Sequence, residues 1–168
     1  MYGIDTSTLP SGLDANEAKS AVKAAFDTWN EEVYGPKFQE GTYTNPQTGK
    51  VSTDVKVSWQ SIDGAGGVLA YTSISFNPRT KAISSANLVF NSGDKWEVLS
   101  SYDCNRSTSL EDPFDIENTA AHEIGHVVGE DHVSSDSTLT MYPYVWPIET
   151  MKRSLELGEK TGVQALYG

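Results

Sequence analysis

The spacing of hydrophobic positions changes along the chain and divides it into predicted elements. After a short opening strand, residues 14–33 carry apolar side chains three and four positions apart, which is typical of a helix that buries one face. These side chains are Ala18, Val22, Ala25, Phe26, Trp29 and Val33. The period then becomes two, which predicts a strand whose alternate side chains are Val51, Val55, Val57 and Trp59.

The second half of the chain predicts a hairpin and two further helices. Residues 68–76 and 82–90 are β-rich runs joined through residues 77–79, Asn-Pro-Arg. Asp112 and Pro113 offer an N-cap and a first-turn proline to a helix that ends near Gly129. Residues 131–147 predict no regular element, and a last helix is expected over residues 155–166. This order predicts an α+β fold in a single domain covering residues 1–168.

Composition and charge exclude several classes of partner. The chain has 168 residues, with 12 Lys and Arg against 23 Asp and Glu, and a formal net charge of −11. Such a charge argues against nucleic acid or an anionic membrane as the partner. There is no apolar run of about 18 residues and no leader-like start. A peptide or protein substrate and a monomeric state are expected.

The histidines carry the strongest chemical signal. All three lie between positions 122 and 132, in the pattern HExxHxxGxxH. On a helix, His122 and His126 lie on one face with β-carbons about 5–6 Å apart, so both can bind one zinc ion. Gly129 can end the helix and let His132 return as the third ligand. Three imidazoles leave a fourth position for water, as in catalytic rather than structural zinc sites.

Glu123 follows the first predicted ligand and is the candidate general base. Its carboxylate would accept a proton from the activated water and pass it to the leaving amine, which predicts zinc-dependent hydrolysis of peptide bonds. Two alternatives stay open. A gluzincin-type peptidase would use Glu149 as third ligand in place of His132, and a zinc-containing peptide-binding module would lack catalysis.

The zinc pattern, together with Met141 in the run Thr-Met-Tyr-Pro at 140–143, resembles the metzincin metalloproteases, which place a methionine turn beneath the zinc. Within that clan the chain resembles the catalytic domain of the matrixins, or matrix metalloproteinases. The likeness extends over residues 25–29, 63–70, 90–96 and 162–168.

This resemblance implies a twisted mixed sheet of about five strands with three helices, one of which carries the zinc motif. It also implies a cleft in which an edge strand binds extended substrate through main-chain hydrogen bonds from Leu69 and Ala70. Pro143 would form a wall of the main specificity pocket. A secreted, mature domain without its leader or propeptide is expected.

Departures from the matrixin pattern affect the predicted metals. Animal matrixins hold a second, structural zinc with histidines, whereas the matching positions here are Tyr71 and Val89. One zinc ion is therefore expected. The resemblance also implies a calcium site formed by Asp63, Asp94 and the carbonyls of Gly64, Gly66 and Val68.

Two further positions leave the picture open. Asn91 stands where the family has a carboxylate, so the alternative to calcium is a glycine turn beside a solvated acidic loop. The single Cys104 cannot form an internal disulfide. Its role stays open between a small buried hydrophobe and an inhibitory thiolate on the zinc.

Overall fold

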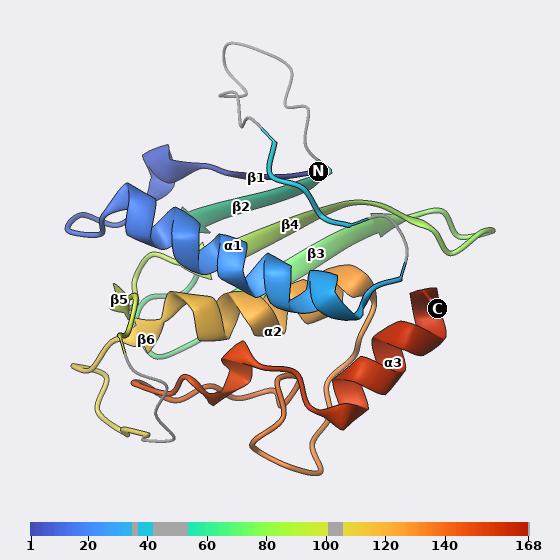
Figure 1. The fold of residues 1–168 in the computed structure, drawn as a ribbon. Coiled ribbons are helices and arrows are strands. Elements are labelled where there is room, and N and C mark those ends of the chain that lie inside the picture. Colours follow the sequence, from blue (N-terminus) through green and yellow to red (C-terminus); the bar gives the residue numbers. More distant parts are fainter. Residues whose placement is uncertain (35–36, 42–53, 101–105, 168) are drawn as a thin grey trace.

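The computed structural model describes residues 1–34, 37–41, 54–100 and 106–167 (Figure 1). Cys104 and the predicted strand residue Val51 lie outside the described residues. The elements are, in chain order, β1 (Tyr2–Ile4), the 3-10 helix η1 (Thr6–Thr8), α1 (Ala15–Glu32), β2 (Val55–Gln60), β3 (Ala70–Phe76), β4 (Ile83–Asn91), β5 (Trp96–Glu97), β6 (Phe114–Asp115), α2 (Ile116–Val128), the 3-10 helix η2 (Met151–Arg153) and α3 (Leu157–Tyr167). The α+β class is confirmed.

The main sheet has the strand order β1-β2-β4-β3. β1, β2 and β4 are parallel, whereas β3 runs antiparallel to β4 as the predicted hairpin, with Tyr71 opposite Val89. The sheet therefore has four strands rather than the expected five. After β4 the chain turns at Asn91, whose carbonyl accepts the Asp94 amide at 3.3 Å. This turn directs β5 away from the sheet to pair with β6.

α1 forms as predicted and supplies one side of the core. Asp14 caps it by accepting the amides of Asn16 and Glu17. In Figure 1 the helix crosses in front of the sheet with α2 beside it. Trp29 of α1 is fully buried, and its indole N–H donates to the carbonyl of Ala121 in α2 at 2.8 Å. The two helices are thus joined within one hydrophobic cluster that also includes the sheet.

α2 begins later than the sequence predicts. Asp115, not Asp112, is its N-cap and accepts the Asn118 amide at 2.8 Å. The physical reason is that residues 114–115 are held in extended conformation by pairing with β5, so the helix cannot start before Ile116. The predicted end is confirmed, since Gly129 has a φ of 99°, a left-handed conformation that glycine adopts without strain.

None of the described helices combines the length and the apolar character that crossing a lipid bilayer requires.

Candidate metal centre and cleft

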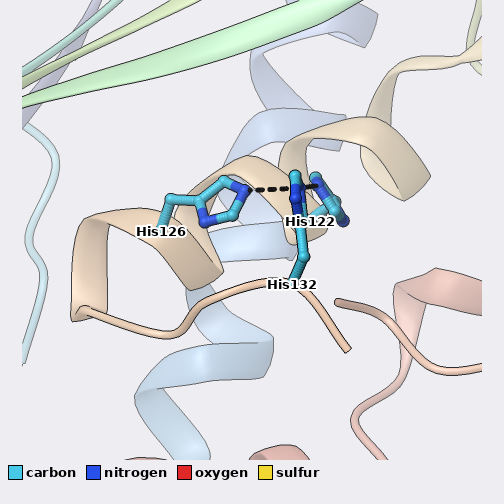
Figure 2. A group of neighbouring side chains, drawn as sticks. All are labelled: His122, His126 and His132. Carbon is cyan, nitrogen blue, oxygen red and sulfur yellow. Dashed lines mark hydrogen bonds between the residues drawn. The ribbon is translucent and has the colours of Figure 1, made fainter. Parts of the chain in front are cut away.

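The three predicted histidines come together at the end of α2. His122 and His126 project from one face of the helix, and the chain beyond Gly129 brings His132 back to them (Figure 2). Nε2 of His132 lies 3.2 Å from Nε2 of His122 and 3.2 Å from Nε2 of His126. Nitrogens bound tetrahedrally to one zinc at about 2.0–2.1 Å are separated by about 3.3 Å. The spacing of the donor atoms therefore fits a zinc ion.

Backbone carbonyls fix which nitrogen of each helical histidine faces the centre. Nδ1 of His122 lies 2.7 Å from the carbonyl of Thr140, and Nδ1 of His126 lies 2.9 Å from that of Glu130. A carbonyl only accepts, so each Nδ1 carries the proton and each Nε2 presents a lone pair. Burial lowers the pKa of His122 to about 3 and also lowers that of His126. These lower pKa values favour the neutral rings that metal binding requires.

Glu123 is buried beside the histidines, with only 4% of its surface exposed. Burial raises the pKa of its carboxyl to about 7, although a hydrogen bond from the Thr72 hydroxyl acts in the opposite direction. A group with a pKa near neutrality can both accept and release a proton.

A cleft of about 790 Å³ runs past the metal centre. Its lining includes His122, Glu123, His126 and His132, together with the predicted substrate contacts Leu69, Ala70 and Pro143. β3 forms one side of it and is the outermost strand of the main sheet. Among the described strands it pairs only with β4, so its other edge is available to an added strand.

Met141 is fully buried and packs against α2 at Gly125, between His122 and His126 in the sequence. Its amide donates to Glu159 at 3.3 Å, and its carbonyl accepts the amide of Val133, the residue after the third histidine, at 3.0 Å. Met141 therefore connects the loop that carries His132 to α3, in addition to packing against α2.

Glu149, the third ligand of the gluzincin alternative, is engaged elsewhere. Its carboxylate is fully buried and forms an ion pair with Lys152 at 2.5 Å, while Oε2 accepts the amide of Trp146 at 3.1 Å. Within the described ranges, the three motif histidines form the only group of side chains arranged to hold a metal ion. Tyr71 and Val89 face each other across the hairpin and offer no imidazole.

The residues of the predicted calcium site surround the side chain of Asn91. Its amide nitrogen donates to Asp63 Oδ1 at 3.1 Å, to the Gly64 carbonyl at 2.7 Å and to the Val68 carbonyl at 3.0 Å. Its Oδ1 accepts the amides of Ile62 at 3.3 Å and Gly93 at 3.1 Å. In this orientation the amide nitrogen meets three oxygens and the amide oxygen meets two N–H groups, so every contact pairs a donor with an acceptor.

The other predicted calcium ligands are arranged differently. Asp94 Oδ1 accepts the backbone amide of Gly66 at 2.8 Å. Its Oδ2 is buried without a hydrogen-bond partner, and burial with the nearby charge of Asp63 raises the pKa of Asp94. The Asn91 amide thus contacts three of the five predicted calcium ligands, the Asp63 carboxylate and the carbonyls of Gly64 and Val68.

Some residues that shape the site were not predicted from the sequence. Thr72 contacts the candidate base, and the carbonyls of Thr140 and Glu130 orient two histidines. A backbone carbonyl has no signature in the sequence. Thr72 occupies an alternate position of a strand, where a threonine is ordinary.

Comparison with known proteins agrees with this geometry. The chain is 28% identical to human matrix metalloproteinase-16 over 160 residues, which is 90% of this chain and 24% of that protein. It is 27% identical to karilysin of Tannerella forsythia over 94% of this chain and 30% of that protein. Metalloendoproteinase 1 of Glycine max is 32% identical over 89% of this chain and 45% of that protein.

The chain thus spans less than half the length of these relatives. The family model for matrixin, a peptidase family, matches residues 1–168. With the three histidines in place on α2 and its following loop, the chain belongs to the matrixin family.

Proposed function

We propose that this chain is a zinc-dependent endopeptidase that cleaves extended polypeptides. The observation that carries the proposal is the convergence of three imidazoles beside a buried carboxyl group, in a cleft bordered by an edge strand. Zinc, held by His122, His126 and His132, would lower the pKa of water from 15.7 to about 7 and polarise the scissile carbonyl.

The chain's own groups supply the remaining chemistry. Glu123 accepts the proton of the attacking water and later donates it to the nitrogen of the leaving amine. The substrate extends along the free edge of β3, where main-chain groups of Leu69 and Ala70 pair with it. Pro143 bounds the pocket for one substrate side chain. Two findings support this assignment. The chain belongs to the matrixin family, and its relatives include matrix metalloproteinases.

The test is cleavage of a mixed pool of quenched fluorescent peptides, with and without 1,10-phenanthroline. We expect the chelator to abolish cleavage, and Glu123→Gln to lower kcat by about 10²–10⁴-fold while retaining zinc. Glu31→Gln makes the same chemical change on the exposed face of α1 and should leave cleavage unchanged. Zinc-loaded wild-type protein that cleaves nothing would instead support the peptide-binding module.

We also propose one zinc ion per chain. The support is that the sequence has three histidines, all of which belong to the HExxHxxGxxH motif. Metal analysis after dialysis should give one equivalent, and His132→Ala should lower zinc affinity. Two equivalents per chain would contradict this proposal. We further propose a secreted monomer, which sedimentation and fractionation of the native host would test.

For the loop at residues 63–68, we propose that the Asn91 amide replaces calcium. The amide nitrogen supplies hydrogen-bond donors to oxygens that would otherwise require a cation. The unfolding temperature of the chelator-treated protein should therefore not respond to millimolar calcium.

Asn91→Asp is the matched variant. It replaces the hydrogen-bonding amide nitrogen with an oxygen and adds a third carboxylate beside those of Asp63 and Asp94. Its stability should fall without calcium and recover when calcium is added. A wild-type protein stabilised by calcium as strongly as this variant would contradict the proposal.

A further inference from the structure

Thr72 reaches from the edge strand to the candidate base. It lies in β3, and its hydroxyl oxygen is 2.7 Å from Oε2 of Glu123 and 3.0 Å from the Glu123 carbonyl oxygen. Side chains alternate across a strand, so Thr72 shares a face with Ala70 and Ile74, which also line the cleft. The contact joins the strand proposed to bind substrate to the residue proposed to move the proton.

The hydroxyl has one proton to give, and the carboxylate is the stronger acceptor. The Glu123 carbonyl lies inside α2, where it can accept the intrahelical bond that helix geometry supplies. In the ionised form that acts as the base, Oε2 carries charge in a buried setting, and it lies closer to the hydroxyl. Hydrogen bonds to charged acceptors are shorter and about twice as strong as neutral ones.

This contact leaves the two carboxylate oxygens in different situations. Oε2 is held by Thr72, whereas Oε1 has no hydrogen bond to any described residue. A glutamate side chain has several rotatable bonds, and fixing one oxygen removes most of that freedom. Glu123 lines the cleft, and Oε1 is the oxygen left to accept a proton there.

We infer that Thr72 is a positioning residue for Glu123. The Thr72 hydroxyl fixes the Glu123 carboxylate so that Oε1 meets the attacking water. The inference rests on the proposed function and adds a residue to it. Thr72 does not itself exchange a proton with the substrate. Its effect is carried through the orientation of Glu123.

The kinetic test compares Thr72→Val with Thr72→Ser. Valine keeps the shape and removes the hydroxyl, so kcat should fall by about 10- to 100-fold, the effect of losing one hydrogen bond to a charged group, with KM unchanged. Serine restores the hydroxyl and should restore most of kcat. Ser73→Ala removes a hydroxyl from the exposed neighbouring position of β3 and should have no effect. All variants should keep one equivalent of zinc.

A second readout does not depend on activity. The urea midpoints of zinc-loaded Thr72→Val, Glu123→Ala and the double variant should be non-additive, because either change alone already removes the contact.

Three results would each overturn the inference while leaving the proposed function standing. They are a wild-type kcat in Thr72→Val, an equal loss of kcat in Thr72→Val and Thr72→Ser, and additive changes in the urea midpoints. A wild-type protein that cleaves nothing would overturn the proposed function and the inference together.

Discussion

Replacing Gly125 with alanine should destabilise the protein by about 2 kcal/mol, although alanine is the better helix former. Gly125 lies in α2 between His122 and His126, the first two predicted zinc ligands. A Cβ built there would overlap Met141 Sδ and lie 2.9 Å from both Met141 Cε and Trp29 Cζ2. Both side chains are fully buried, and Trp29 is held by its bond to Ala121. Overpacking of this kind costs about 1–3 kcal/mol, whereas the gain in helix propensity is about 1 kcal/mol.

We place the overpacking cost at the upper end, about 3 kcal/mol, because neither neighbour can move into open space. A net loss of about 2 kcal/mol corresponds to a fall in Tm of about 4–8 °C for a domain of this size. Urea unfolding followed by tryptophan fluorescence, in constant excess zinc, measures it. Gly158→Ala is the control, because nothing lies within 4 Å of its added Cβ in α3. That change should stabilise the protein by up to about 1 kcal/mol.

A double-mutant cycle separates steric overlap from other causes. Met141→Ala alone should cost about 2–5 kcal/mol, because it leaves a cavity under α2. In that background the new methyl of Gly125→Ala enters the space that the thioether vacates. The double variant should therefore be more stable than the sum of the single changes predicts, by at least about 1 kcal/mol. Additivity, or a Gly125→Ala protein as stable as wild type, would refute the steric explanation.

Three further predictions concern the core, the metal and pH. Lys152→Met leaves the buried Glu149 carboxylate without its nearest cation and should cost about 3–5 kcal/mol by urea unfolding, whereas adding Glu149→Gln should recover part of that loss. Zinc at about 1,000 times its dissociation constant should raise the unfolding free energy by about 4 kcal/mol, and His132→Ala should abolish most of this rise. Burial raises the pKa of Tyr2 from 10.0 to about 12, so stability is fully present below pH 10 and is lost as the pH rises toward 12; Tyr2→Phe should flatten this loss, which is at most about 3 kcal/mol.

Periodicity predicts the elements whose burial depends on one repeating face. α1 and the β3–β4 hairpin formed where apolar spacing placed them, since each buries a stripe or a face set by local sequence. The predicted start of α2 was wrong. Asp112-Pro113 is a good local start for a helix, but the pairing of Phe114 with Trp96 keeps the chain extended. That pairing joins residues far apart in the sequence, and no local pattern encodes it.

The cluster of three histidines was predictable because one helix and one glycine bring together side chains that lie within eleven positions of the chain. The loop around Asn91 was only half predictable. The sequence showed that Asn91 replaces a carboxylate, but a side-chain amide can present either oxygen or nitrogen. Only the surrounding carbonyls and N–H groups of Gly64, Val68, Ile62 and Gly93 decide which.

The hydrogen bond from His122 to the Thr140 carbonyl couples the cleft to the predicted zinc site. Thr140 directly precedes Met141 and the stretch leading to Pro143, which lines the cleft. Under the proposed function, a peptide that shifts this segment would move the acceptor that sets the basicity of His122 and would so change zinc affinity. Thermodynamic reciprocity then requires that zinc change peptide affinity by the same factor. Zinc titrations with and without a bound, uncleaved peptide therefore report on the same coupling from opposite ends.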